Sequence, residues 1–397
     1  MSKKLLVLAA SSEQIETIKK AKQLGCQVVT LDNRPANPGH RIADKCYAVD
    51  TTDMDGVLAV ARREAIDGVI SPCTDVAVPT AAYVAQALHL KGPPVETCRI
   101  VCDKIRFREF LHQEGFPLPR HIALDSRTDP DDSLFIEGPW IIKPDRSSGS
   151  KGVFIVRSRA EFRQRLAETL RFSPAGHAIL ERFIDGFQGT CEAVLQNGSI
   201  RLSFLLDRQT APAPHVTTSG HIVPSLLAPE LQWMVLTELA KLWNHLEYSD
   251  GPFDCDFVAT DKEIYLLEVS PRMGGNSISS LILESTGFDL AEYSIRRALN
   301  QDYPVPTGLS TKPAAVVILG AFQAGRLWYD RAEAEALAKE SWVRLLHFDI
   351  DWGGPVFPFI DSRHRIGQAI VTGESRDDVE ARVAALKRRL GIRAIEA

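Results

Sequence analysis

The feature that most constrains this chain is a lysine at the end of a short apolar run, followed at once by a loop of small residues. Residues 140–143 read Trp-Ile-Ile-Lys, Pro144 ends the run, and residues 147–152 read Ser-Ser-Gly-Ser-Lys-Gly before a second run rich in β-branched residues. This pattern predicts strand, flexible loop, strand. Small residues let backbone N–H groups approach a polyphosphate, and the lysine supplies positive charge there. We therefore predict a hairpin lid over phosphate, with an ordinary flexible surface hairpin as the alternative. It is not a P-loop, because no Gly-Lys-Ser/Thr ending and no helix follow.

Two acidic residues in a second hairpin indicate a metal ion. Asp256 and Glu268 lie in two largely apolar runs joined by a turn at residues 261–263. If that turn is a three-residue hairpin loop, Asp256 stands opposite Glu268, and Asp254 and Ser270 share their face. Facing carboxylates repel unless a hard cation lies between them, and oxygen ligands without thiolate or imidazole favour magnesium. A solvated strand face is the alternative, but the flanking apolar residues favour a covered sheet.

Length and composition limit the number of domains and the kinds of partner. The 397 residues predict two or three domains at about 150 residues each. Lys and Arg number 46 against 51 Asp and Glu, a net charge of −5, so neither nucleic acid nor a membrane surface is an expected partner. The apolar runs are shorter than the ~18 residues of a membrane span, and seven scattered cysteines indicate neither a disulfide framework nor a zinc site. We expect a cytoplasmic protein.

The N-terminal part alternates strands and helices. An apolar strand over residues 5–9 is followed by a capping-box pattern at Ser11 and a second strand over residues 27–31, and further units continue to about residue 88. This order predicts a parallel sheet whose ligands lie at the carboxyl ends of its strands, where Asp32 and Asp75 occur. An NAD site is disfavoured because the first turn has no Gly-x-Gly-x-x-Gly fingerprint, and both aspartates are also ordinary turn formers.

The middle of the chain offers further candidates. One helix is predicted over residues 97–114, and Lys104 falls within its apolar stripe, either snorkelling out or aimed into a cleft. Residues 178–186 read as a strand and turn whose freed backbone groups could contact an adenine edge. Residues 211–225 read as a loop too polar and proline-rich for a regular element, in which His215 and His221 are either substrate contacts or exposed histidines.

The last part of the chain is an α+β region without evident chemistry. Prolines from residue 304 onward mark a linker. Strands are predicted over residues 315–319, 343–350 and 366–372, and a helix over residues 377–390.

Taken together, these motifs resemble the ATP-grasp superfamily, in the order usual for that family. The resemblance implies a mixed α/β and α+β fold with a Rossmann-like domain at residues 1–95, a two-lobed ATP-grasp domain at 96–305 and a small C-terminal α+β domain at 306–397. The small lobe would cover about residues 117–183, and the large lobe about 184–305. The Gly220-His221 segment and the Pro271-to-Asn276 ending are more similar to the amino-acid ligase branch than to the carboxylase branch.

The resemblance also implies roles for single residues. Lys104 and Lys143 match the lysines that contact ATP phosphates. The ATP-binding loop and the adenine segment, with one further glutamate, would comprise Ser147, Ser148, Gly149, Ser150, Gly152, Glu181, Arg182, Phe183, Ile184 and Glu192. Asp256 and Glu268 match the magnesium ligands, with Mn²⁺ as an alternative ion. Ser270 stands where many members have Asn, so it would be a weaker ligand.

The function that follows is an ADP-forming ligase that joins a small carboxylate to an amine through an acyl phosphate. Arg272 and Lys143 would be its catalytic residues, acting by positioning and charge neutralisation. An amino acid or similar small acid would bind among Arg272, Gly274, Gly275, His215 and His221. A bicarbonate-activating carboxylase, an NAD-linked oxidoreductase and a non-catalytic nucleotide-binding protein are the alternatives, and a homodimer is an expectation.

Overall fold

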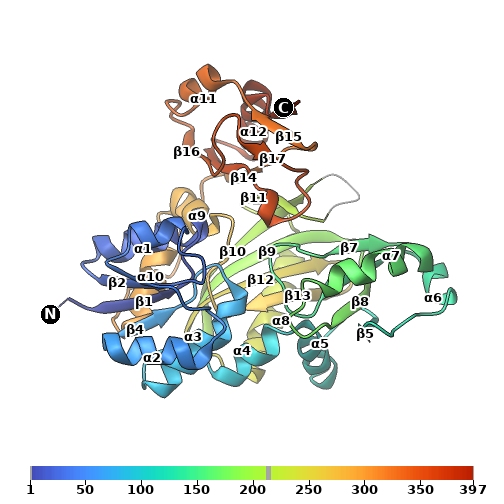
Figure 1. Ribbon diagram of the computed structural model, residues 1–397, viewed down its shortest axis with the longest axis horizontal. Helices are drawn as coiled ribbons and strands as arrows, with labels where there is room; N and C mark the ends of the chain where they lie inside the picture. Colours follow the sequence, from blue (N-terminus) through green and yellow to red (C-terminus); the bar gives the residue numbers. More distant parts are fainter. Residues whose placement is uncertain (1, 212–215, 397) are drawn as a thin grey trace.

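The structure is a computed structural model that describes residues 2–211 and 216–396 and confirms the predicted mixed architecture. It begins with a four-stranded parallel sheet in the order β3-β2-β1-β4, seen at the left of Figure 1. The elements are β1 (Lys4–Leu8), η1 (Ser12–Gln14), α1 (Ile15–Gln23), β2 (Gln27–Leu31), η2 (Pro38–Arg41), β3 (Lys45–Tyr47), α2 (Met54–Glu64), β4 (Gly68–Ile70), η3 (Asp75–Ala77) and α3 (Val78–Ala87). Residues 5–8 are fully buried, as a parallel strand covered on both faces requires.

A second four-stranded sheet carries the predicted lid. Its order is β5-β8-β6-β7, all antiparallel, and β6 pairs with β7 as the strand-loop-strand pattern predicts. The elements of this small lobe are β5 (His121–Leu124), α6 (Ser133–Ile136), β6 (Trp140–Pro144), β7 (Phe154–Val156), α7 (Arg159–Leu170) and β8 (Ala178–Arg182). Trp140 and Phe162 are both fully buried where α7 packs on the sheet, at the right of Figure 1.

The largest sheet has the order β13-β12-β9-β10-β11-β14-β18-β16. Its strands are β9 (Phe187–Gln196), β10 (Ser199–Thr210), β11 (Thr218–Val223), β12 (Gly251–Ala259), β13 (Ile264–Ser270), β14 (Ala314–Leu319), β16 (Val343–Phe348) and β18 (Gly367–Thr372). The C-terminal strands thus continue the sheet of the large lobe through the β11–β14 pairing. The predicted division near residue 305 falls in the stretch between α10 and β14, and the three-domain division itself stays a prediction.

Helices cover both faces of this sheet. On one face, α4 (Val95–Val101), α5 (Lys104–Gln113) and α8 (Pro229–His245) bury Phe107 and Trp243 against Phe253 and Leu266. On the other, α9 (Ile278–Thr286) and α10 (Leu290–Ala298) pack in a second core. No helix in the described part of the chain is both long and apolar enough to cross a bilayer.

The C-terminal region lies at the top of Figure 1 and adds a three-stranded sheet, β17-β15-β19. Its other elements are β15 (Gly325–Trp328), α11 (Arg331–Leu337), β17 (Pro355–Val356), η4 (Ser362–His364), α12 (Arg376–Leu390) and β19 (Arg393–Ile395). The three predicted strands and the final helix are present within two residues of their expected ends. The short elements β15, α11, β17 and β19 were not predicted.

The helix predicted over residues 97–114 is wrong as a single element. Two helices, α4 and α5, replace it, because the Asp103 side chain accepts hydrogen bonds from the backbone N–H groups of Ile105 (3.1 Å) and Arg106 (3.2 Å) and so caps a new helix. Lys104 is therefore the first residue of α5, and its own N–H donates to Asp145 O at 2.9 Å. The break places this lysine beside the lid.

The expectation that residues 211–225 form no regular element is also wrong. Residues 218–223 are β11, a strand between β10 and β14 in the middle of the large sheet. The available signal for this strand was its β-branched end, Ile222-Val223. The polar residues at its start gave no strand pattern, because they pair with strands that are distant in sequence. His221 lies on this strand, whereas His215 falls outside the described residues.

Candidate active site

One cavity lies between the small lobe and the large sheet, and we call it the interlobe cavity. β6, β8 and the loop at residues 145–153 form one side, and β12 and β13 form the other. Eleven of the residues predicted to bind ATP or metal line it: Lys104, Lys143, Ser147, Gly149, Ser150, Glu181, Arg182, Phe183, Ile184, Asp256 and Glu268. Ser148, Gly152 and Glu192 are not part of its wall.

The two acidic residues predicted to face one another do so. Asp256 pairs with Glu268 across β12 and β13, and Asp254 pairs with Ser270. The loop that joins the strands is one residue longer than predicted, because Ala259 pairs with Ile264. A bulge between Asp256 and Phe257 restores the register, and without it Asp256 would face a leucine. The bulge therefore puts both carboxylates on the wall of the cavity.

Asp256 is held from behind by a chain of hydrogen bonds. Thr190 Oγ1, on the neighbouring strand β9, donates to Asp256 Oδ1 at 2.6 Å, and His221 Nε2 lies 3.2 Å from the same hydroxyl. Because the threonine proton goes to Asp256, His221 Nε2 must be the donor in the second bond. Arg208 Nε lies 3.7 Å from Asp256 Oδ2 on the open side. His221 is thus 2% exposed and does not line the interlobe cavity.

The buried His221 gives a testable pH dependence. Burial lowers its pKa from 6.5 to about 4, so the unfolded chain takes up a proton at mildly acidic pH before the folded chain does. From about pH 7.5 to about pH 5, the unaltered protein should lose about 2 kcal/mol more stability than His221→Gln, which keeps a donor but does not titrate. Urea unfolding of both proteins across this range measures the difference, and parallel curves would contradict it.

A buried ion network joins the small lobe to the large sheet. Glu181 accepts Arg108 Nε at 2.7 Å, and its second oxygen lies 2.5 Å from Lys143 Nζ. Arg108 is fully buried and also donates to Leu266 O (3.2 Å) and Leu267 O (2.8 Å) on β13. Burial raises the pKa of Glu181, but the two cations outweigh it and lower that pKa to about 2. The side chain of Glu181 therefore holds Lys143 in place, whereas the prediction for this residue concerned only its backbone.

Lys104 faces the same cavity from the other side. Its ammonium group donates to Ser147 O at 3.0 Å and to Glu268 Oε1 at 3.2 Å. Burial works to lower the pKa of Lys104, but the Glu268 carboxylate raises it on balance, so this lysine is charged. Burial lowers the pKa of Lys143. Two lysines from different elements thus approach the lid loop and the paired carboxylates.

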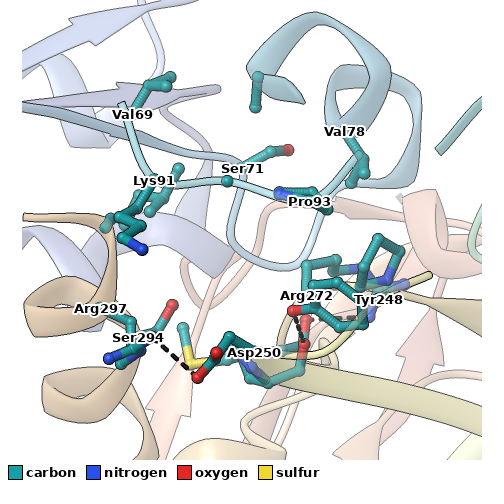
Figure 2. A pocket seen from close by; sticks show the side chains of 18 of the residues that line it. Val69, Ser71, Val78, Lys91, Pro93, Tyr248, Asp250, Arg272, Ser294 and Arg297 are labelled. Carbon is teal, nitrogen blue, oxygen red and sulfur yellow. Dashed lines mark hydrogen bonds and ion pairs between the residues drawn. The ribbon is translucent and has the colours of Figure 1, made fainter. Parts of the chain in front are cut away.

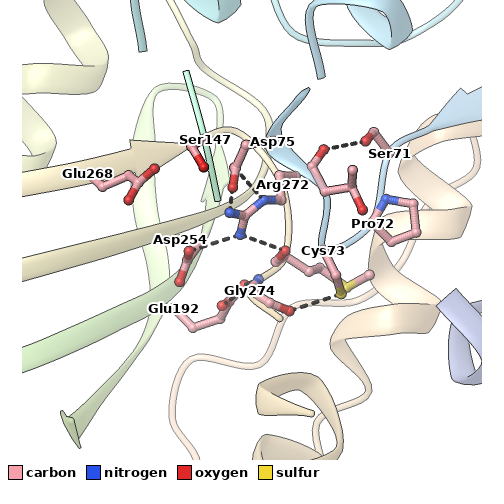
Figure 3. Close-up of polar contacts among 12 residues, drawn as sticks. Ser71, Pro72, Cys73, Asp75, Ser147, Glu192, Asp254, Glu268, Arg272 and Gly274 are labelled. Carbon is pink, nitrogen blue, oxygen red and sulfur yellow. Dashed lines mark hydrogen bonds and ion pairs between the residues drawn. The ribbon is translucent and has the colours of Figure 1, made fainter. Parts of the chain in front are cut away.

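Arg272 lies beside the interlobe cavity, within a group of acidic residues (Figure 3). Its Nε and Nη2 donate to Asp75 Oδ1 of the first domain at 2.9 and 2.5 Å, and its Nη1 donates to Asp254 Oδ2 at 2.9 Å. Glu192 accepts the N–H of Gly274 at 2.9 Å on the same side. Burial raises the pKa of Asp254 to about 7 and that of Glu192 well above its usual range. One guanidinium therefore pairs with two partly buried carboxylates, Asp75 and Asp254.

Two further cavities adjoin Arg272 and its neighbours. The first continues from Ser147 and Glu268 toward the first domain and is lined by three arginines, Arg99, Arg106 and Arg146. Figure 2 shows the second, between the first domain and α10, where Lys91 lies near the Asp250–Arg297 ion pair (2.8 Å) and Arg272 closes one end. This second cavity shares no lining residue with the interlobe cavity.

The residues present fit a magnesium ion that shares its ligands with phosphate. Within residues 2–211 and 216–396, no three His, Cys, Asp or Glu side chains form a metal-binding group on their own. Asp256 and Glu268 are 29% and 37% exposed toward the cavity, and they offer only oxygen donors. Magnesium is usually held by one or two carboxylates plus substrate phosphates, so the pair is sufficient. Ser270 faces Asp254 instead, and its buried hydroxyl has no partner among the described residues.

Several residues of the site were missed from the sequence. Asp75 and Asp254 were noted only for their positions, and Thr190, Arg108 and Arg208 were not singled out. Arg108 had a usable signal, because it follows Lys104 by four residues and so lies on the same helical face. Asp32, noted at the end of a predicted strand, accepts the N–H groups of Ala10 (3.0 Å) and Arg34 (2.9 Å) and so acts as a turn former.

Comparison with known proteins agrees with this geometry. A family model described as the ATP-grasp domain matches residues 101–276. Formate-dependent phosphoribosylglycinamide formyltransferases are similar along nearly the whole chain: that of Paraburkholderia xenovorans is 22% identical over 391 residues (96% of this chain, 93% of the relative), and that of Thioalkalivibrio sulfidiphilus is 24% identical over 396 residues (96% and 94%).

Solved structures show the same fold. The L-amino acid ligase from Bacillus licheniformis superposes with a TM-score of 0.83 at 20% identity, covering 100% of this chain and 99% of that one. Phosphoribosylglycinamide synthetase from Anaerococcus prevotii gives 0.77 at 20% identity, with both chains fully covered. The predicted fold is therefore confirmed, these relatives support the predicted enzyme class, and residues 101–276 of this chain are an ATP-grasp domain.

Proposed function

We propose that this protein is an ATP-dependent carboxylate–amine ligase that works through an acyl phosphate and releases ADP and phosphate. One observation carries the proposal. Two lysines and two facing carboxylates open onto a single cavity beneath a loop of small residues. That combination suits the triphosphate of ATP, because the cations hold phosphate oxygens and the carboxylates hold a divalent ion that the phosphates share.

The adenine would lie at the end of the cavity formed by residues 181–184. The N–H groups of Arg182 and Phe183 already donate to Arg120 O (2.8 Å) and Pro139 O (3.1 Å). The carbonyl groups of this segment and the N–H of Ile184 are thus the groups we assign to the adenine edge, while Ile141, Val258 and Leu267 form its apolar slot.

The chemistry needs positioning more than covalent participation. The substrate carboxylate attacks the γ-phosphorus, ADP leaves, and an amine then displaces phosphate from the acyl phosphate to form an amide. Lys104 and Lys143 hold the phosphate oxygens, and we assign to Arg272 the charge that develops on the acyl group. Magnesium bound by Asp256 and Glu268 would neutralise charge on the phosphates. The lid loop excludes water, which would otherwise hydrolyse the acyl phosphate.

The nucleotide product tests this mechanism. With a competent pair of carboxylate and amine, we expect ADP and inorganic phosphate in equal amounts, together with one amide per ADP. Chromatography of the nucleotides and a phosphate assay on the same reaction measure this ratio. Formation of AMP and pyrophosphate would refute the acyl-phosphate route.

An amino acid or similarly small polar acid is the substrate class we favour. The arginines at this end of the site are already paired: Arg272 with Asp75 and Asp254, and Arg365 with Glu13 and Asp349. A substrate that carries an ammonium group as well as a carboxylate fits such a balanced surface better than a phosphate monoester does. Gly274 and Gly275 lie within this surface, and the L-amino acid ligase of Bacillus licheniformis shares the fold.

A phosphorylated substrate is the second candidate, and a specific observation favours it. The cavity that continues from Ser147 and Glu268 is lined by Arg99, Arg106 and Arg146, which lie 3.6 Å from Glu96, 4.0 Å from Asp103 and 2.8 Å from Asp103 but keep about half of their side chains exposed. The formyltransferases and the phosphoribosylglycinamide synthetase named above are called after a phosphoribosyl compound. A substrate screen that includes both amino acids and phosphoribosyl amines, read by phosphate release, separates the two.

A cytoplasmic location and a homodimer stay predictions from the sequence.

A further inference from the structure

We infer that residues 360–363 of the C-terminal region form a latch that holds the lid loop, residues 147–152, closed over the interlobe cavity. Its catalytic meaning rests on the proposed function, because a closed lid is useful only to an enzyme that shields a reactive phosphate from water. Ser362 and Arg363 are thereby positioning residues. The C-terminal region gains a role that its own sequence motifs did not indicate.

The central contact is between two backbones. Ser362 N donates to Gly149 O at 2.9 Å, which ties the tip of the lid to the first residue of η4. Gly149 has a φ of +68°, and a Cβ built on it would lie 2.1 Å from Ser362 Oγ. Any other residue at this position would therefore be strained and would also push the latch away.

A second contact reaches the support of the lid. Arg363 places its guanidinium carbon 4.7 Å from the centre of the Phe172 ring, which follows α7 in the small lobe. Phe172 in turn lies against Gly152, where an added Cβ would meet the ring at 2.7 Å, and Thr169 Oγ1 donates to Gly152 O at 2.9 Å. The latch thus contacts the lid at Gly149 and, through Phe172, braces its far end.

The latch itself is firmly anchored. Asp361 is 3% exposed and accepts the N–H of Arg363 at 2.9 Å and its Nη2 at 2.7 Å, which fixes the turn. Thr217 Oγ1 donates to Ile360 O, and Phe359 N donates to Ala321 O at 2.8 Å. Because these anchors belong to the large sheet and the C-terminal region, opening of the lid must break the Ser362 and Arg363 contacts while the turn stays in place.

Ser362→Pro tests the latch directly. Ser362 is the first residue of a helical turn and follows the extended Asp361, so proline fits its backbone and removes the N–H that binds Gly149 together with the hydroxyl. Ser362→Ala keeps that N–H and is the matched control. We expect trypsin to cut after Arg146 and Lys151 about fivefold faster in Ser362→Pro, as the loss of one backbone hydrogen bond predicts, and at the unaltered rate in Ser362→Ala.

The readout does not depend on turnover, so the latch and the proposed function can fail separately. Lid cleavage at the same rate in Ser362→Pro and the unaltered protein overturns the latch. If Ser362→Pro does not fold, Arg363→Gln replaces it, with about twofold faster lid cleavage expected and an unchanged rate overturning the inference. Cleavage at other sites, followed by mass spectrometry, must stay constant for the effect to count as local. In active protein we further expect a higher ratio of ADP to amide in Ser362→Pro, because an unlatched lid admits water.

Discussion

Glu268→Gln should reduce ATP turnover by roughly 10²- to 10³-fold while leaving the fold intact. Such losses are usual when one preorganised stabiliser of transition-state charge is removed. The substitution keeps the side-chain volume but removes the charge that faces Asp256 and pairs with Lys104 at 3.2 Å. The Glu268 side chain is 37% exposed, and Lys104 keeps its hydrogen bond to Ser147 O, so the fold should survive the loss of this ion pair. Magnesium-dependent ADP formation and thermal unfolding, measured on one preparation, test both halves of this statement.

Glu263→Gln is the matched control. Glu263 lies on the same hairpin, is exposed, and hydrogen-bonds Tyr265 at 2.5 Å away from the interlobe cavity. We expect its turnover to equal that of the unaltered protein. Near-normal activity in Glu268→Gln would mean that this carboxylate serves the structure alone.

Arg108→Met should have the largest effect on stability, lowering the free energy of unfolding by about 3–5 kcal/mol. Arg108 has no exposed side-chain surface, and its loss leaves Glu181 buried with Lys143 alone and two carbonyl groups of β13 without their donors. A buried carboxylate that has lost one of its two cations, beside two buried carbonyl groups without donors, is less stable than the intact network. Chemical denaturation measures the change.

Arg106→Met, two residues earlier on α5, controls for the loss of an arginine. Its side chain is 51% exposed and lies 4.0 Å from Asp103, so a change of less than about 1 kcal/mol is expected. Equal effects of Arg108→Met and Arg106→Met would contradict the network described here.

Local chemistry made much of the site predictable. A Ser/Gly loop between two short apolar runs predicts a hairpin, and β6 and β7 pair as expected. The prediction that Asp256 faces Glu268 is correct, but for a reason that the sequence did not show. The prediction assumed a three-residue loop, whereas the structure has a longer loop and a bulge that compensates for it. Bulges depend on the neighbouring strand, so a single sequence gives little sign of them.

Contacts between distant segments could not be predicted from the sequence. Arg272 meets Asp75 at a separation of 197 residues, and Ser362 meets Gly149 across a still longer stretch. β11 was missed because its polar start is stabilised by strands on both sides and not by its own pattern. The long helix was split by Asp103, which in sequence is equally compatible with an exposed helical position.

The central claim is that the interlobe cavity binds ATP with its metal ion between Asp256 and Glu268. A crystal structure with a non-hydrolysable ATP analogue and Mn²⁺ tests it most directly, because manganese can be located by its anomalous signal. We predict a manganese peak in contact with both carboxylates, with the phosphates next to Lys104 and Lys143 beneath the lid. Nucleotide bound elsewhere, or manganese away from Asp256 and Glu268, would contradict the account.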